Sequence, residues 1–318
     1  MMADAATATG RLRRLAEELA ESGLQLYGSE DLRQMLLEEI DQALRPRVHE
    51  RRVPSTGTIL DPRSDPETWS AGAQLDITRG TVDQSLPYAR RFADGLSGWL
   101  VRRADGANEW MVFDRPAGSE RDLVVLSGVL DATIVQRHPD GFVRVVGRFG
   151  VLRWRGFTWH HEPAVTSWID AVTASPEHGD PAVLEAMLEF AVHDLGARGI
   201  GAILVYRADA ARESAIELRL PPPPPLDLRR PSDLAPLRHA LSQIDGAAVV
   251  DHEGVLRELG VRLVPSPEAE SVVDGLRGMR HTSGRRYSFD DPGATVIVIS
   301  EDGPVTVLRG GEVIGRSS

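Results

Sequence analysis

The sequence contains no cysteine and no lysine. Without cysteine the chain cannot form disulfides, thiolate nucleophiles or zinc ribbons. Without lysine it cannot be a P-loop NTPase, whose lysine reaches the β- and γ-phosphates, or a Schiff-base or pyridoxal-phosphate enzyme. All 36 basic residues are therefore arginines, a bias that a GC-rich genome also produces. Any anion must be bound by arginine, by backbone N–H groups or by a metal ion.

The chain also lacks a long apolar run and an excess of positive charge. No stretch reaches the roughly 18 apolar residues of a transmembrane helix, and residues 1–19 contain no apolar core of a signal peptide. The formal net charge is −11, which disfavours broad attraction to nucleic acid or anionic lipid. We therefore expect a cytoplasmic protein without a DNA or membrane partner. Its arginines favour a small phosphate-bearing ligand.

The N-terminal part of the chain predicts an α+β, strand-rich domain in three segments. Residues 1–50 carry leucines at helical spacing and predict one or two amphipathic helices that face a core or pair with another helix. Residues 51–96 are rich in Pro, Asp, Ser, Thr and Gly and are typical of an irregular linker. Residues 97–178 predict a small antiparallel sheet with a sensor or regulatory role, with strands at GWLVRR, EWMVFD, DLVVLSG, DATIVQ, FVRVVGRF and VLRWRGFTW.

Residues 179–318 predict an α/β domain, a mixed sheet flanked by helices. The apolar stripe at 181–197 indicates a helix that leads through two glycines into the strand AILVY. Further strands are expected at GAAVVD, VLRELGVRLV, TVIVIS and PVTVLRG. The similar segments 126–152 and 241–263 arise either from a degenerate internal duplication or from two hairpins of similar composition, and we favour the hairpins.

Three short pieces of this domain carry the chemistry of a nucleotide site. Asp245-Gly246-Ala247 places a carboxylate, which can bind a ribose hydroxyl or a divalent metal, beside a glycine that lets the backbone approach a ligand. Arg280-His281 opens a predicted helix, where a guanidinium, a proton carrier and free N–H groups suit a phosphate. Glu301, in Ser300-Glu301-Asp302-Gly303 at a strand end, can complete the coordination of a metal.

The segment SGRRYS (283–288) also looks like a helix start, where Arg285 and Arg286 would add positive charge in the same turn. Taken one at a time, these pieces are common: a DG pair is usually a hairpin turn, and an Arg-His pair usually lies on the surface. Their order and spacing make the combination specific.

In that order and spacing the pieces resemble the diadenylate cyclase domain family. The family carries a DGA motif, a strand with a leucine, an RHR motif introduced by Gly-Thr, and a strand that often ends in Ser-Glu-Glu. This chain has DGA at 245–247, GVRLVPSP at 260–267, GMRHTSG at 278–284 and VISEDG at 298–303. It departs from the family at Met279, which stands in place of the threonine, and at Thr282, which stands in place of the second arginine of RHR. Either Thr282 is a substitution, or a one-residue deletion brings TSGRR into the register of the family's following helix; Arg285 or Arg286 could then reach the same phosphate.

The resemblance implies the condensation of two ATP molecules into cyclic di-AMP, with Mn²⁺ or Mg²⁺ as cofactor, by two cyclase domains that face each other. It implies catalytic roles for Asp245, Gly246, Ala247, Arg280 and His281, nucleotide contacts by Leu263, Thr282, Ser283, Arg285, Arg286 and Ser300, and metal binding by Asp245 and Glu301. The alternative is a nucleotide-binding regulator that has kept the fold and lost the chemistry, which the missing arginine favours. A structural or interaction protein is the third interpretation.

Overall fold

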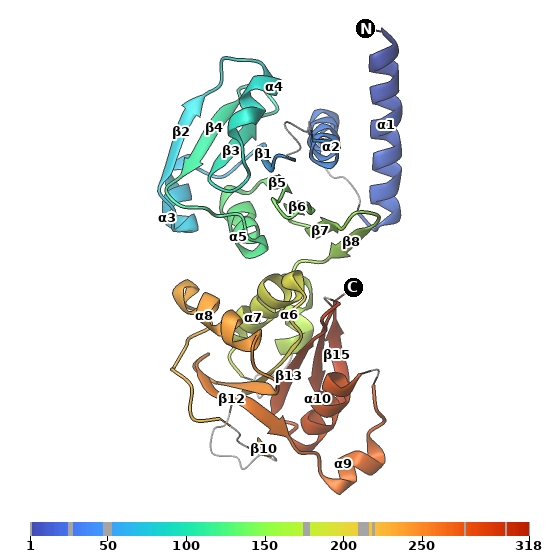
Figure 1. Ribbon diagram of the computed structural model, residues 1–318, viewed down its shortest axis with the longest axis vertical. Helices are drawn as coiled ribbons and strands as arrows, with labels where there is room; N and C mark the ends of the chain where they lie inside the picture. The colour runs from blue at the N-terminus through green and yellow to red at the C-terminus, as the bar shows by residue number, and fades with distance from the viewer. Residues whose placement is uncertain are drawn as a thin grey trace. The chain divides into compact units, whose positions relative to one another are not determined.

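The computed structural model describes residues 2–24, 28–46, 53–173, 179–208, 216–217, 220–276, 278–302 and 304–317. The chain divides into two compact units, Met1–Ala164 and Val165–Ser318. Each unit is a mixed β-sheet with helices on both faces (Figure 1). The predicted α/β architecture of the C-terminal part is therefore confirmed, and the N-terminal part is also a sheet flanked by helices.

The N-terminal unit is built around an eight-stranded sheet. Its strand order is β2-β4-β3-β1-β5-β6-β7-β8, and β1 and β3 are the one parallel pair among the pairs described in it. The elements in chain order are α1 (Met2–Glu21), α2 (Glu30–Leu44), β1 (Thr56–Leu60), η1 (Pro66–Thr68), α3 (Trp69–Ala73), β2 (Ile77–Thr81), α4 (Leu86–Ala89), η2 (Arg90–Phe92), β3 (Gly98–Arg102), β4 (Glu109–Phe113), α5 (Glu120–Leu130), β5 (Thr133–Arg137), β6 (Val143–Gly147), β7 (Gly150–Trp154) and β8 (Trp159–Glu162).

Two apolar layers hold this unit together. On one face, the leucine stripes of α1 and α2 pack against strand residues such as Leu60 and Val145, as their helical spacing predicts. On the other face, α3 and α5 pack against residues such as Trp99 and Ile134. The alternation of strand side chains between the two faces produces this division.

The C-terminal unit contains a seven-stranded sheet in the order β10-β12-β11-β9-β13-β14-β15. Its elements are α6 (Thr166–Thr173), α7 (Pro181–Glu189), a π-helical turn η4 (Phe190–Leu195), η5 (Gly196–Arg198), β9 (Ala202–Arg207), β10 (Ile216–Glu217), α8 (Pro231–Leu241), β11 (Ala247–Asp251), β12 (Leu256–Leu263), α9 (Pro267–Val272), α10 (Met279–Asp290), β13 (Ala294–Ile299), β14 (Val305–Arg309) and β15 (Glu312–Arg316).

The core of this unit also has two layers. Helices α6, α7 and α8 cover one face of the sheet, and α10 covers the other. Helix α10 lies close to the sheet because Gly284 faces it: a Cβ there would lie 2.9 Å from Val298 Cγ2 and 3.2 Å from Val296 Cγ1. This close approach fixes the position of the helix that carries Arg280 and His281.

Three expectations from the sequence are wrong. DLVVLSG belongs to helix α5, because Ser119 and Asp122 form a capping box and the buried leucines 123, 126 and 130 recur at helical spacing. The expected linker 51–96 contains β1, β2 and several short helices; β1 is ordered by pairing with β3 and β5, which its composition does not reveal. The division between the units falls before the expected boundary at 179, since Val165 and Val172 belong to the core of the second unit.

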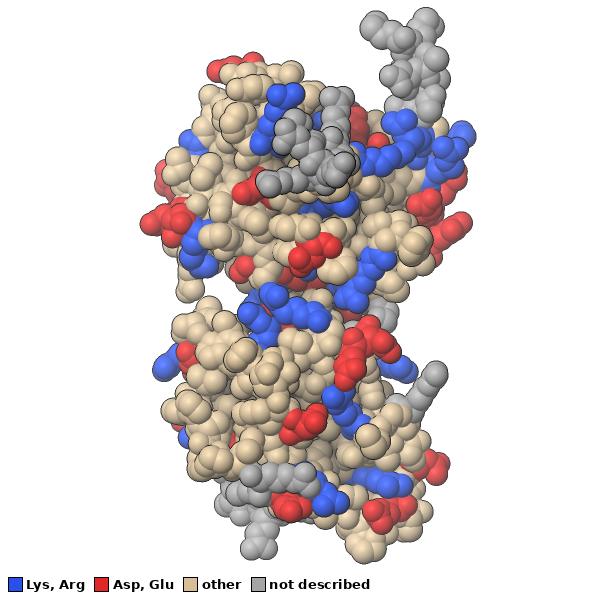
Figure 2. Space-filling view, viewed as in Figure 1, with Lys and Arg blue, Asp and Glu red and all other residues tan. Residues whose placement is uncertain are grey.

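The similar segments 126–152 and 241–263 each contain antiparallel hairpin strands, as expected, and each begins with the end of a helix. The first contains the end of α5 with β5 to β7, and the second contains the end of α8 with β11 and β12. Arginine and acidic side chains are interspersed on the face of the molecule seen in Figure 2. Among the described residues, we find no helix of the length and hydropathy that would let it cross a membrane.

Candidate active site

The three predicted pieces lie at the same end of the C-terminal sheet. Strands β9 and β11 are parallel, with Ile203 opposite Ala247, so both begin at this end. Strand β13 is antiparallel to β9, with Ile299 opposite Ala202, so it finishes there. The sheet therefore brings the residues before β11 and those after β13 to either side of the start of β9.

Arg280, in the first turn of α10, reaches this end of the sheet. Its Nη1 forms an ion pair with Oε1 of Glu301 at 2.9 Å. The pair lies over Gly201, just before β9: a Cβ on Gly201 would collide with Arg280 Nη1 and lie 2.9 Å from Glu301 Cγ. Both side chains remain substantially exposed, 39% for Arg280 and 69% for Glu301. The cation is thus held in place but is accessible to an incoming anion.

Asp245 and Gly246 form the entrance to β11. Gly246 has φ +111°, and a Cβ there would lie 2.7 Å from the carbonyl carbon of Gly260 and 2.9 Å from the oxygen of Val261. Only glycine fits this position without backbone movement. The tight turn leaves Asp245 exposed at the sheet end, and buries Ala247 as the first residue of the strand.

His281 is half-buried beside Arg280. Its Nε2 lies 3.3 Å from Oγ1 of Thr306, the second residue of β14. Burial lowers the pKa of His281, and the positive charge of Arg316 lowers it further. The imidazole is therefore neutral at pH 7, and it can accept a proton or donate a hydrogen bond.

Thr282 holds the segment that leads into α10. Its Oγ1 lies 2.9 Å from the oxygen of Leu276 and 3.1 Å from that of Gly278, and accepts a hydrogen bond from the N–H of Leu276 at 3.1 Å. The residue at the position of the family's second arginine is thus bound to its own loop.

Arg285 and Arg286 point away from the Arg280 side of the helix. At about 100° per residue they lie roughly 140° and 240° around the axis from Arg280. Arg285 Nε donates to the oxygen of Gly311 at 2.6 Å, and Arg286 Nε donates to that of Val273 at 3.4 Å. The structure therefore does not bring these two arginines to the side of the helix that carries Arg280.

The expected helix start at SGRRYS is also wrong, because α10 begins at Met279. Ser283 therefore lies inside the helix, partly exposed, and the free N–H groups of the first turn belong to residues near Arg280. Ser300 lies just after β13, where its N–H donates to the oxygen of Pro304 at 3.0 Å. Leu263, the last residue of β12, is 7% exposed in the apolar layer beneath α10.

Two carboxylates at this end of the sheet suit a hard divalent cation. Asp245 is exposed and Glu301 has only the exposed pair with Arg280, so both can offer oxygen ligands to Mg²⁺ or Mn²⁺. No group of three or more His, Asp or Glu side chains is arranged for a metal in the described part of the chain. A metal bound by either carboxylate would have to take most of its ligands from other groups, as Mg²⁺ commonly does from phosphates and water.

Sequence reasoning missed three residues of this region: Gly201, Thr306 and Arg316. Gly201 was noted only as part of the connection into β9, and its contact with Arg280 depends on the pairing of three strands. Thr306 is a polar residue between two valines in β14, which is a usable signal. Arg316 offered none.

Comparison with known families gives two matches. Residues 13–162 match a family model described as "Probable sensor domain DACNK", and residues 189–313 match "DisA bacterial checkpoint controller nucleotide-binding", the DAC domain. The C-terminal unit of this chain belongs to the DAC family. The matched region contains Gly201, Asp245, Arg280, His281 and Glu301.

Solved structures show weaker likeness. A hypothetical membrane spanning protein from Bacillus cereus is 22% identical, with 48% of this chain and 70% of that chain covered and a TM-score of 0.35. A double mutant of DacA from Staphylococcus aureus is 16% identical, with 43% and 87% covered and a TM-score of 0.27. No curated protein matches the chain.

Proposed function

We propose that the C-terminal unit is a diadenylate cyclase, which condenses two ATP molecules into cyclic di-AMP. The observation that carries this proposal is the position of Asp245, Arg280 and Glu301 at the same sheet end, in a unit of the DAC family. In the reaction the 3′-oxygen of each ATP forms a bond to the α-phosphorus of the other. Each α-phosphorus loses its bond to the bridging oxygen, and two pyrophosphates leave.

Each side chain has a task that its surroundings permit. Arg280 exchanges its exposed partner Glu301 for the nucleotide's phosphates and neutralises charge that develops on them. Asp245 binds the attacking ribose hydroxyl, and the absence of a side chain at Gly246 lets the nucleotide lie against the backbone. Neutral His281 donates to or accepts from a phosphate group beside Arg280.

A divalent metal held by Asp245 and Glu301 would supply further positive charge at the phosphates and would favour ionisation of the hydroxyl. Most of the catalysis would then come from positioning and from charge neutralisation, as is usual in phosphoryl and nucleotidyl transfer.

Two units must face each other for this reaction, because each holds one ATP and the product joins two. We therefore propose self-association of the chain through its C-terminal units. The exposed position of Asp245 and Glu301 at a sheet end supports such an arrangement, since a second nucleotide can reach them.

The second candidate is a nucleotide-binding regulator with weak or no catalysis. It is favoured by Thr282, whose hydroxyl is bound to Leu276 and Gly278 where the family has an arginine. A missing charge-assisted contact to phosphate is worth about 1.5–3 kcal/mol, or about ten- to hundredfold in rate.

One experiment separates these functions. The full chain is incubated with ATP and Mn²⁺, and cyclic di-AMP is measured by mass spectrometry while ATP binding is measured by calorimetry. Product that disappears in Asp245→Asn and persists in the exposed control Asp274→Asn supports the cyclase. Saturable ATP binding without product supports the regulator, and neither binding nor product contradicts both.

A further inference from the structure

The two units share one sheet topology. Strands β2-β4-β3-β1-β5-β6-β7 of the first unit follow the same order as β10-β12-β11-β9-β13-β14-β15 of the second. The strand directions agree as well: β1 is parallel to β3 as β9 is to β11, and the other neighbouring pairs are antiparallel in both units. Strand β8 is an addition at the edge of the first sheet.

The helices occupy corresponding positions in the order of elements of the two units. Helix α2 precedes β1 as α7 precedes β9, α4 precedes β3 as α8 precedes β11, and α5 precedes β5 as α10 precedes β13. In both units the first of these helices covers one face and the last covers the other. The N-terminal unit is thus a second copy of the fold, in a register different from that of the similar sequence segments 126–152 and 241–263.

The second copy also has an Asp-Gly pair at the corresponding sheet end, Asp94-Gly95 before β3. Here the carboxylate is already used: Oδ1 of Asp94 accepts hydrogen bonds from the N–H groups of Leu96, Ser97 and Gly98 at 2.8–2.9 Å. Asp245, at the matching place before β11, is exposed, as Asp94 also is.

In the N-terminal unit, side chains also fill the space over the start of the central strand, β1. Gly57, in β1, packs against Gly95 and the fully buried indole of Trp99, which would lie 2.5 Å from a Cβ at Gly57. In the second unit the corresponding stretch, Gly246 and Ala247 at the entrance to β11, carries no large side chain. Gln136 closes the gap further, because its Nε2 donates to the oxygens of Gly95 at 2.7 Å and Gly118 at 3.0 Å.

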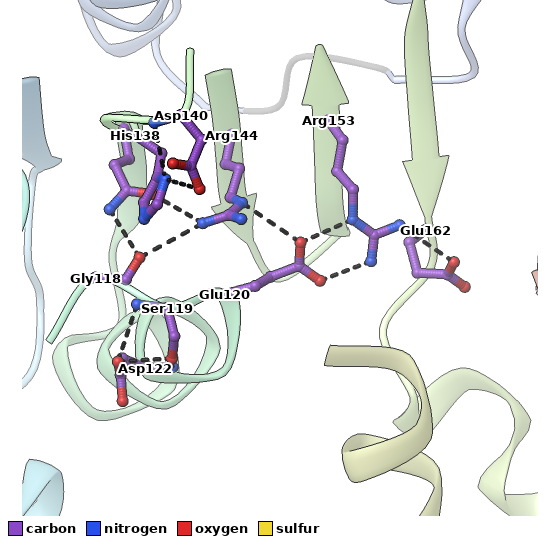
Figure 3. Close-up of polar contacts among 10 residues, drawn as sticks. Gly118, Ser119, Glu120, Asp122, His138, Asp140, Arg144, Arg153 and Glu162 are labelled. Carbon is purple, nitrogen blue, oxygen red and sulfur yellow. Dashed lines mark hydrogen bonds and ion pairs between the residues drawn. The ribbon is translucent and has the colours of Figure 1, made fainter. Parts of the chain in front are cut away.

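The first turns of the two helices differ in charge. Helix α10 begins Met279-Arg280-His281, whereas α5 begins with Glu120, followed by Arg121 and Asp122. The Glu120 side chain is 1% exposed and lies between two arginines (Figure 3). Arg153 donates to it from Nε at 2.7 Å and from Nη2 at 2.6 Å, and Arg144 Nε lies 3.7 Å from its Oε2.

Strand registers place these arginines at the matching positions. Arg144 is the second residue of β6 and pairs with Arg153 on β7. Thr306 is the second residue of β14, contacts His281 from the first turn of α10, and pairs with Arg316 on β15. Arg153 also contacts Glu162, with Nη1 and Oε2 3.6 Å apart.

We propose that Arg144 and Arg153 form an anion site in the N-terminal unit, the counterpart of the nucleotide site, which is permanently occupied by the chain's own carboxylate, Glu120. That the counterpart is a nucleotide site rests on the proposed function of the C-terminal unit. Bidentate arginine pairing of this kind suits carboxylate and phosphate alike. The unit therefore binds no nucleotide at this place, and would bind a phosphate group there once Glu120 is removed.

The first test maps nucleotide binding on the intact chain. The protein is photo-labelled with 8-azido-ATP, with and without excess ATP, and labelled peptides are assigned by mass spectrometry. We expect ATP-protected labels only within 165–318. ATP-protected labels within 53–162 would overturn the proposal. Absence of label from both units would contradict the proposed function of the C-terminal unit while agreeing with a closed N-terminal site.

The second test removes the internal carboxylate of Glu120 from the anion site in the full chain. Glu120→Ala leaves two buried guanidinium groups without this partner, and should lower the unfolding temperature of the N-terminal unit by roughly 10 °C. Hydrogen exchange in peptides covering 118–155 should then slow again on addition of inorganic pyrophosphate. The same salt should leave wild-type exchange in these peptides unchanged.

Glu120→Gln keeps the shape of the side chain, and it replaces Glu120→Ala in this test if the alanine variant does not fold. Arg148→Ala, which removes the exposed pair with Asp131, is the matched control and should shift neither stability nor the pyrophosphate response. Pyrophosphate that slows exchange equally in wild type and variants, or in none of them, would refute the anion site.

Discussion

Arg280 and Glu301 form an ion pair across the start of β9, with Nη1 and Oε1 2.9 Å apart above the bare backbone of Gly201. A pair this exposed contributes only about 0–1 kcal/mol to stability. A charge-assisted contact between arginine and phosphate is worth about 1.5–3 kcal/mol. The exchange of Glu301 for a nucleotide phosphate is therefore favourable, and it leaves the carboxylate available to a metal.

Replacement of Arg280 by glutamine should slow cyclic di-AMP formation by about ten- to hundredfold, because the phosphate contact is lost and the side chain keeps most of its length. The rate is measured by mass spectrometry at saturating ATP. Arg262→Gln is the control, since Arg262 makes a comparable exposed pair with Glu217, with Nη1 and Oε2 3.4 Å apart. Equal losses in the two variants would contradict a specific role for Arg280.

Gly246→Ala should destabilise the C-terminal unit by about 2–4 kcal/mol, because it adds a Cβ at φ +111° and 2.7 Å from the backbone of Gly260. Urea unfolding of the full chain measures the change. Gly310→Ala separates conformation from collision, since Gly310 has φ +55° and open space around it, and should cost about 1 kcal/mol. Similar losses at both positions would show that the close approach to Gly260 contributes little.

Thr282→Val should loosen the segment before α10, because the hydroxyl that binds Leu276 and Gly278 is removed. We expect a loss of about 1–2 kcal/mol in unfolding free energy and faster hydrogen exchange in the peptide covering 274–282. Thr282→Ser retains the hydroxyl and should behave like wild type in exchange. If serine and valine give the same exchange, the hydroxyl does not hold this segment.

His281 should make the C-terminal unit less stable in acid. Burial, with Arg316, lowers its pKa in the folded state below the unfolded value of about 6.5. The unfolded chain then binds more protons as the pH falls, so unfolding free energy drops from about pH 6.5 down through the lowered pKa. In the His281→Asn variant, the unfolding free energy of the C-terminal unit should fall less over this pH range than it does in the wild type. A profile for His281→Asn parallel to wild type throughout would rule out this contribution.

The sequence was a good guide to the C-terminal unit where local pattern decides structure. The stripe at 181–197 and the strands AILVY, GAAVVD and TVIVIS formed as predicted, since helical spacing and short apolar runs are local signals. The pair Val124-Val125 suggested a strand, yet a capping box at Ser119 and the spacing of the buried leucines decided for a helix. That box was readable in the sequence.

The rest depended on contacts between distant segments. Strand β1 is short and acquires its order from neighbours about 40 and 80 residues away, so composition alone indicated a linker. The directions of Arg285 and Arg286 depended on one continuous helix from Met279, which places them roughly 140° and 240° around the axis from Arg280. Contacts such as His281 with Thr306 required the completed sheet.

Gly284 has a consequence for the chemistry more than a helical turn away. With a hydrogen atom instead of a methyl group facing Val298, α10 can neither roll nor slide along β13 without driving its backbone into a valine. The helix is anchored at its middle, so the direction in which Arg280 leaves the first turn is set by steric fit rather than by charge. The precise placement of the Arg280 side chain therefore depends on Gly284, a residue that has no functional group.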